Sequence, residues 1–502
     1  MKVNSATLLA SVLSTYIVCF YSSTGLALEV NHKLRESCIS LTLDGSDQDL
    51  DIVGMSVLRT GTIQQYIDQY QSAIYERNAA ITYFVPTVNL SFSTSYNYNP
   101  TYDTTIYDLS SNRSSASSDK TLTQSSMPEY NMNNPNLLAN WNVLDIQQIY
   151  QIESLGLTAK AARYESALEA NQAISSAINY YISYLQEKQT SQAALKVVAS
   201  LQKTVADVKQ LYAAGQRSLI DVLSLKQQLD AYQSTLESTL SSADLAKGNL
   251  DALLYSPSCQ QSKTIEASQA YQSLHQLSSQ YLSESLTTAL ATYPQLANLS
   301  ANAKAYQKMA DSYASSYLPT LSLSANLQSQ YEYGNISGKT SSPPYQYDIN
   351  QTNYIMALAT WNIFDGGQNI MNMESQRKLS SGYSESLIQA EKALQSIYQA
   401  AILGDIKLTS SIIYIEDSLK AALQSQDLVN IAYKAGYKSY LDIINSVQSV
   451  YTSLSTLASA QASYASNRYT LLAYLSYPNL KSTHAALKSL YDSGSLKIPI
   501  NK

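Results

Sequence analysis

Residues 139–145 read ANWNVLD, and residues 359–365 read ATWNIFD. The only two tryptophans of the chain, Trp141 and Trp361, occupy the same place in these two stretches. Two more pairs of similar stretches occur in the same order: YFVPTVNLS at 83–91 with SYLPTLSLS at 316–324, and AGQRSLIDVL at 214–223 with AGYKSYLDII at 435–444. From the tryptophan to the glycine of the third pair is 74 residues in the first half and 75 in the second. This order and spacing predict an internal structural duplication.

Runs of alternating polarity follow the proline of each half and precede each tryptophan. Val88, Leu90 and Phe92, for example, alternate with asparagine and serine. About ten residues of such alternation suit a tilted strand that crosses a bilayer, with its apolar side towards lipid and its polar side towards a lumen. A half-buried sheet of a soluble protein has the same pattern. We expect strands over residues 87–98, 136–145, 320–331 and 353–364. Trp141 and Trp361 would then suit the aromatic belt at a membrane interface.

Long stretches without proline follow the two tryptophan motifs. Apolar residues recur there at alternating spacings of three and four, as in Val198, Leu201 and Val205, which is typical of coiled coils. We expect two pairs of long helices, 146–214 with 217–254 and 366–435 with 439–475, turning at Gly215 and Gly436. Shorter helices are expected near 63–83 and 294–316.

The N-terminus suggests export, and the repeats divide the rest of the chain into segments. Lys2, an apolar run and a small-residue pattern ending at Ala27 predict a secretory signal over 1–27; a single membrane anchor is the alternative, although the run is short for one. A first repeat (28–255), a linker (256–290), a second repeat (291–477) and a tail without an assigned role (478–502) would follow. Cys38 and Cys259 would remain after cleavage, either paired in an oxidising compartment or as free thiols.

Composition argues against several function classes. The net charge of −6 and the lack of a basic run disfavour a nucleic-acid partner. The three histidines are isolated, and neither a metal-ligand spacing nor a nucleophile motif is present in the sequence. We therefore predict no enzyme activity, no cofactor and no metal site.

Strand counting predicts an oligomer. The smallest membrane barrels have about eight strands, and this chain offers four. An open sheet edge in lipid would leave backbone groups without hydrogen-bond partners. If the strands span a membrane, the chain must share a barrel with copies of itself, although counting alone does not give their number.

The ordered motifs resemble those of the TolC-type outer-membrane factor family, from about Asp47 to Leu475. The resemblance implies an α+β membrane protein: a homotrimer whose 12-stranded β-barrel, with four strands from each protomer, lies in the lipid of the outer membrane. A long α-helical coiled-coil barrel would continue it into the periplasm. It also implies a periplasmic adaptor (membrane fusion) protein and an inner-membrane pump of the RND, ABC or MFS type as partners. The function would be an exit duct for efflux or for type I secretion, and the sequence does not separate these two. The alternative is a non-conducting structural or adhesive coiled-coil protein anchored at the surface.

The resemblance also implies a periplasmic gate at the helix turns. The positions carried over are Asp221, Asp442, Tyr433 and Lys438, and Arg217 is the first-half counterpart of Lys438. The family often has a second acid one helical turn after Asp442, where this chain has Asn445. Three copies of Asp442 around a narrow lumen would favour cations. As an alternative or an additional role, Asp221 and Asp442 follow Ser218 and Ser439 by three residues, which is the spacing of a helix-capping box.

Overall fold

The computed structural model describes residues 47–98, 129–254, 285–335, 345–477 and 480–496. The expected signal peptide, Cys38 and Cys259 lie outside these residues. The chain divides into two compact units, one of residues 1–72, 159–302 and 382–502 and the other of residues 73–158 and 303–381.

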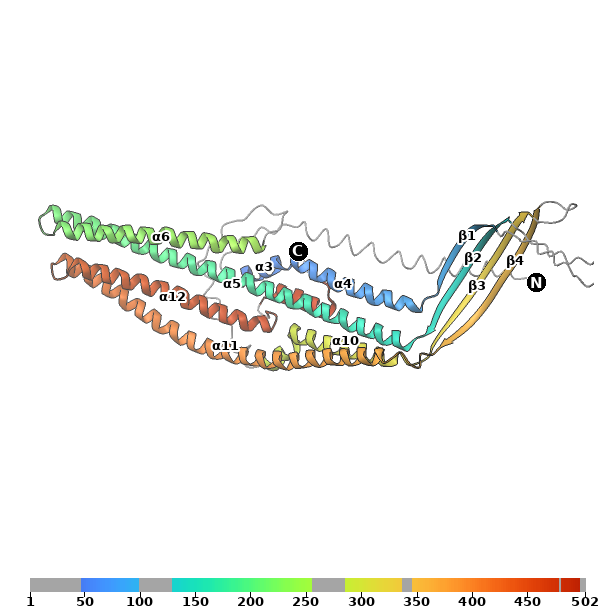
Figure 1. Cartoon of the computed structure of the whole chain (residues 1–502). Coiled ribbons are helices and arrows are strands. Elements are labelled where there is room, and N and C mark those ends of the chain that lie inside the picture. The colour runs from blue at the N-terminus through green and yellow to red at the C-terminus, as the bar shows by residue number, and fades with distance from the viewer. Residues whose placement is uncertain (1–46, 99–128, 255–284, 336–344, 478–479, 497–502) are drawn as a thin grey trace, which may run out of the picture. The chain divides into compact units, whose positions relative to one another are not determined.

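The smaller unit holds one antiparallel sheet in the order β1-β2-β3-β4 (Figure 1). Its strands are β1 (Thr87–Tyr98), β2 (Glu129–Leu144), β3 (Thr320–Asn335) and β4 (Tyr345–Thr360). The short 3₁₀ helix η1 (Thr82–Phe84) precedes β1. The two predicted β-hairpins are thus neighbours in one sheet, and β1 and β4 form its edges.

Two kinds of error affect the predicted strand ends. β2 and β4 begin earlier than predicted and β3 ends later, at Asn335, because backbone pairing continues where the alternation of side-chain polarity fades. The predicted continuation of β4 to residue 364 is wrong, since the strand ends at Thr360. Thr360 pairs with Thr320, and the next partner on β3 would be Pro319, which has no N–H to donate.

The larger unit contains the two predicted helical hairpins. The first consists of α5 (Ile146–Ala213) and α6 (Leu219–Leu254), and the second of α11 (Gln368–Lys434) and α12 (Tyr440–Tyr474). The N-terminal ends of α5 and α11 belong to the sheet unit, as do parts of α4 (Gly61–Ile81) and α10 (Pro294–Ser315). A short helix α9 (Ser285–Thr292) begins inside the expected linker. Among the described helices, none combines the length and the apolar character needed to span a bilayer.

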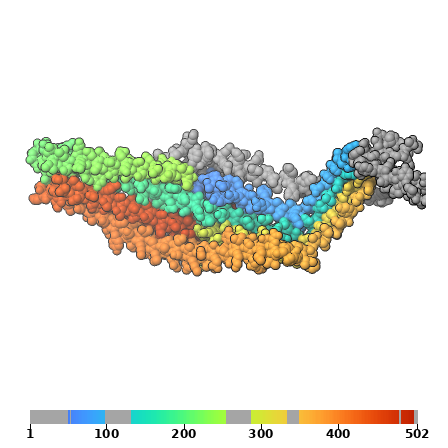
Figure 2. Space-filling view, in the orientation of Figure 1, coloured from blue at the N-terminus to red at the C-terminus, as the bar shows by residue number. Residues whose placement is uncertain are grey.

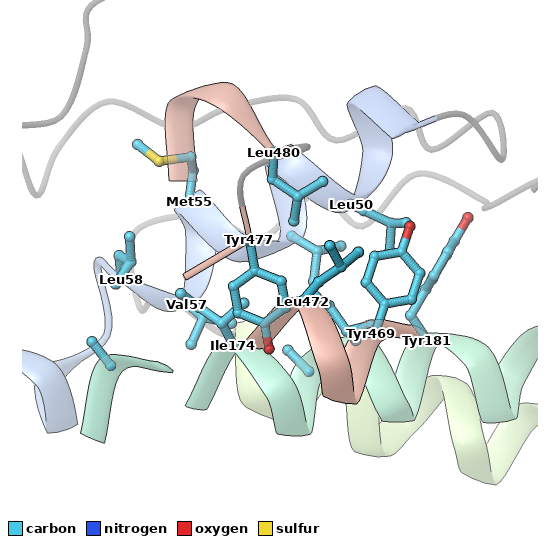
Figure 3. Close-up of a cluster of buried hydrophobic side chains, with 14 of the residues drawn as sticks. Leu50, Met55, Val57, Leu58, Ile174, Tyr181, Tyr469, Leu472, Tyr477 and Leu480 are labelled. Carbon is cyan, nitrogen blue, oxygen red and sulfur yellow. The ribbon is translucent and has the colours of Figure 1, made fainter. Parts of the chain in front are cut away.

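The C-terminal tail, which had no assigned role, forms helix α13 (Lys481–Ser493) and packs against α3 (Asp47–Val57). Figure 3 shows this core, in which α3, α5 and α12 surround Tyr477 and Leu480. Asp51 of α3 accepts hydrogen bonds from the backbone N–H groups of Ser482 at 3.1 Å and Thr483 at 2.8 Å. The start of α13 is therefore capped by a carboxylate from the opposite end of the chain.

Replacement of Asp51 tests this cap. Asp51→Ala should lower stability by about 1–2 kcal/mol, because the first N–H groups of α13 lose their acceptor and the Thr483 hydroxyl loses a partner. A fall in the thermal midpoint, followed by circular dichroism in detergent, would report the loss. Asp51→Asn keeps one side-chain acceptor, so its thermal midpoint should lie between those of the wild type and Asp51→Ala. Equal midpoints for all three proteins would contradict the capping role.

Candidate functional site at the helix turns

The two helical hairpins turn at glycines in a left-handed conformation. Gly215 has φ +71° and Gly436 has φ +87°. The N–H of Gln216 donates to the carbonyl of Leu211 at 2.9 Å, and the equivalent bond from Tyr437 to Ala432 is also 2.9 Å. This is the Schellman motif, which needs a residue that tolerates positive φ after the helix.

The returning helices begin with the predicted caps. The backbone N–H of Asp442 donates to the Ser439 hydroxyl at 3.4 Å, and the N–H of Ser439 donates to the Asp442 carboxylate at 2.8 Å, which completes a capping box. In the first hairpin, the N–H of Asp221 donates to the Ser218 hydroxyl at 3.2 Å. Capping therefore accounts locally for both acids, and each carboxylate can still accept hydrogen bonds from further donors.

The first hairpin holds the last turn of α11 through Arg217 and Asp221. The hydroxyl of Tyr433 donates to the Asp221 carboxylate at 3.1 Å. The Arg217 guanidinium donates to the Tyr433 carbonyl and lies 4.1 Å from the centre of the Tyr433 ring. Tyr433 is almost completely buried, and this burial, together with the nearby Asp221, raises the pKa of its phenol to about 12. The phenol thus remains a donor at physiological pH. We call Arg217, Asp221 and Tyr433 the inter-hairpin latch.

Within the described part of the chain, the equivalent residues of the second turn contact each other and not the first hairpin. The Lys438 ammonium lies 3.3 Å from the Asp442 carboxylate, four residues on. The Ser439 N–H, the Ser439 hydroxyl and Lys438 hold the pKa of Asp442 below its ordinary value of 3.8. Asn445 lies exposed on α12, one turn after Asp442. The structure therefore divides the predicted gate residues into two groups, and only the first group joins the two hairpins.

Below the turns, an apolar core and one ion pair also join the hairpins. The core contains Leu201 and Val208 of α5, Leu225 of α6 and Ile443 of α12. Figures 1 and 2 show the hairpins lying against each other up to the turns. Lys434 of α11 lies 2.6 Å from Asp207 of α5, beside a groove of about 460 Å³.

Sequence reasoning missed the pair of Asp207 and Lys434. Lys434 is next to Tyr433, which is the one signal that could have singled it out. Asp207 lies between Ala206 and Val208 as an isolated acid within α5, so no local pattern distinguishes it. Among the described residues, no cluster of three histidine, cysteine, aspartate or glutamate side chains could hold a metal ion.

The two tryptophans mark equivalent corners of the sheet unit. The indole N–H of Trp141 donates to the Phe84 carbonyl at 2.9 Å, and that of Trp361 donates to the Tyr317 carbonyl at 2.7 Å. Trp141 is 41% exposed and Trp361 is 64% exposed, while the indole N–H of each has an acceptor. This suits a membrane interface, where one side of the ring meets lipid, and that position stays a prediction.

Comparison with known proteins gives matches in structure only. No protein-family model matches the chain, and no curated protein matches it. The outer membrane protein VceC from Vibrio cholerae matches with a TM-score of 0.66 at 15% identity, covering 85% of this chain and 95% of that one. The Campylobacter jejuni CmeC outer membrane channel matches with a TM-score of 0.64 at 13% identity, covering 88% and 89%. The Neisseria gonorrhoeae MtrE outer membrane channel matches with a TM-score of 0.63 at 14% identity, covering 88% and 94%. The chain therefore has the fold of these outer-membrane channels, and the resemblance to TolC-type factors is confirmed at the level of the fold.

Tyr433→Phe tests the hydrogen bond of the latch. The variant keeps the ring next to Arg217 and removes the hydroxyl that donates to the Asp221 carboxylate, which should cost about 1.5–3 kcal/mol and lower the thermal midpoint in detergent. Tyr437→Phe is the matched control, because Tyr437 is 87% exposed at the neighbouring turn. If the two variants unfold at the same temperature, the hydroxyl of Tyr433 makes no net contribution.

Acid should weaken the capping box at the start of α12, because it protonates Asp442. Because its pKa is lower in the folded chain than its ordinary value, the carboxylate stabilises the fold above about pH 4, and this contribution is lost as the pH falls through the folded-state pKa. Thermal midpoints of the wild type and Asp442→Asn, measured between about pH 2 and 7, should differ most near neutrality and converge in acid. A difference that is independent of pH would show that ionisation of Asp442 is not involved.

Proposed function

We propose that this chain is an exit duct of the outer membrane, in which three copies form one barrel and substrates pass from the periplasm to the outside. The fold shared with solved outer-membrane channels is the observation that carries this proposal. The same likeness supports an outer-membrane location with the helical hairpins in the periplasm. A periplasmic adaptor and an inner-membrane pump are the partners proposed for an efflux or type I secretion system.

The two faces of the sheet differ in polarity, as the lipid-facing and water-facing sides of a membrane barrel would. Leu90, Leu137 and Leu327 lie side by side in one row across β1, β2 and β3. The adjacent row contains Ser91, Asn136, Gln328 and Thr352. Since neighbouring residues of a strand point to opposite faces, one face is mainly apolar and the other mainly polar, although Asn353 of β4 lies beside Leu327 in the apolar row. A barrel closed from such sheets would place the apolar face against lipid and the polar face around water.

The helix turns supply a gate in this proposal. Opening the duct by separating the second hairpin from the first would break the contacts that Arg217 and Asp221 make with Tyr433. Hydrogen bonds to charged groups contribute about 1.5–3 kcal/mol each, so the latch favours the closed arrangement by an amount that a docking partner could supply. Asp442 of three copies would form an acidic ring that attracts cations, and the neutral Asn445 leaves the chain without a second ring.

Single-channel recording in a planar bilayer tests the duct and its latch together. Wild-type oligomers should show rare openings that prefer cations. Arg217→Ala should raise the ratio of open to closed time by at least about tenfold, as expected from the loss of roughly 1.5 kcal/mol or more. Asp442→Ala should reduce the preference for cations. Lys420→Ala, an exposed substitution on α11, should leave both properties unchanged.

The outcomes separate the possible roles. Conductance that is unaffected by Arg217→Ala and Asp442→Ala would keep the duct and place its constriction elsewhere, leaving Asp442 as a helix cap. A correctly assembled oligomer that never conducts, in any of these variants, would favour the structural or adhesive alternative.

A further inference from the structure

Strand β4 is apolar on both of its faces near its end. Residues 354–359 read YIMALA, whereas the equivalent residues 134–139 of β2 read NPNLLA. The two strands correspond because Asn140 and Thr360, which precede the two tryptophans, pair with the first residues of β1 and β3. A continuous apolar run is typical of a strand that meets apolar groups on both faces. Lipid would supply them on one face of β4, and the other face needs a second explanation.

Three of these side chains lie on the face that is polar over most of the sheet. Tyr354, Met356 and Leu358 are 43%, 44% and 48% exposed. Their partners on β3 are, in the same order, Asn326, Ser324 and Ser322. The three side chains are two residues apart along one strand, so they form a stripe about 14 Å long, at about 3.4 Å per residue. We call them the β4 stripe.

The neighbouring strands offer the β4 stripe polar side chains. In the described residues, β4 is an edge of the sheet and β3 is its one neighbour. In the proposed barrel, the strand beyond this edge is β1 of another copy, which carries Asn89, Ser91 and Ser93 on the polar face. An apolar stripe that faces water between polar neighbours costs free energy unless other apolar groups cover it. A solute in the lumen can supply those groups.

The charges of the sheet suit a neutral or positively charged solute. The four strands contain three acids and neither lysine, arginine nor histidine. Asn326, the partner of Tyr354, is only 6% exposed, and its side-chain Oδ1 has no donor among the described residues. A buried acceptor without a donor is costly, so an N–H or O–H group beside the stripe would be stabilised there.

We propose that the β4 stripe is a contact track for neutral or positively charged solutes that have an apolar body. The apolar body would lie on Tyr354, Met356 and Leu358, while polar groups of the solute meet the amide and hydroxyl groups of β3. Half-exposed side chains hold such a body weakly, which suits conduction, because a solute must leave the lumen as well as enter it. This inference rests on the proposed duct, and it states what one part of the lumen recognises.

Cysteine modification in isolated outer membranes tests the track. In a Cys38→Ser/Cys259→Ser background, Ser324→Cys places a thiol opposite Met356. The rate with benzyl methanethiosulfonate is divided by the rate with methyl methanethiosulfonate, and this ratio is normalised to a free thiol in solution. Tyr354→Ser/Met356→Ser/Leu358→Ser should lower the ratio by about threefold to tenfold, because the phenyl ring of the reagent loses its apolar contact.

Asn140→Cys provides the matched control. Asn140 of β2 lies in the same row as Ser324 and Met356, and two strand spacings, about 10 Å, separate it from β4. The ratio at Asn140→Cys should be lower than at Ser324→Cys and should not respond to the three serine substitutions.

The duplication also allows the stripe to be transferred to β2. Asn134→Tyr with Asn136→Met gives β2 the residues of the stripe, because Leu138 already stands where β4 has Leu358. The transfer should raise the ratio at Asn140→Cys by about threefold to tenfold. It decides the question if the protein with three serines does not assemble.

The charge of the solute is tested at Ser324→Cys as well. Relative to a free thiol, 2-(trimethylammonium)ethyl methanethiosulfonate should react faster there than 2-sulfonatoethyl methanethiosulfonate. A preference for the anionic reagent would contradict the charge selectivity of the track.

The remaining outcomes separate the track from the duct. Ratios that change neither when the stripe is removed nor when it is transferred would overturn the track, while reactive thiols at both positions would keep the polar face lined by water. Thiols that react with none of the reagents in assembled oligomers would show that this face does not line water, which would overturn the proposed function together with the track.

Discussion

A β-strand must find partners for its backbone N–H and C=O groups, and this requirement organises the sheet unit. Each inner strand of the order β1-β2-β3-β4 is paired on both sides, and the edge strands are paired on one. The apolar face of the sheet carries large exposed side chains such as Leu90. In the proposed membrane setting, lipid would cover the apolar face of this sheet, and neighbouring copies would pair with its two backbone edges.

The duplication explains how the chain builds this sheet by using one design of β-hairpin and helical hairpin twice. Two β-hairpins of the same register are joined to two helical hairpins of the same design, each with a glycine at its turn and a serine cap after it. The difference in exposure between Phe364 and Leu144 shows which positions of the second repeat lack the neighbours that the first repeat has.

The repeats diverge at the helix turns, where we propose the gate. Arg217 and Lys438 occupy equivalent places, but Arg217 crosses to Tyr433 of the other hairpin, whereas Lys438 pairs with Asp442 of its own turn. A guanidinium can donate to a carbonyl and stack on a ring at the same time, which an ammonium does less well. One turn thus fastens the hairpins to each other, and the other keeps its acidic group at an exposed corner.

The sequence by itself determined the features that depend on neighbouring residues. The period of two predicts the strands, the spacing of three and four predicts the helical hairpins, and Gly215, Gly436 and the serine caps mark the turns, because these signals are local. Only the tertiary structure decided that Asp51 caps α13, that Asp207 meets Lys434, and that β4 ends at Thr360. The first two depend on contacts between residues far apart in the sequence. The third depends on whether a neighbouring strand offers β4 a further partner, and no local pattern encodes either.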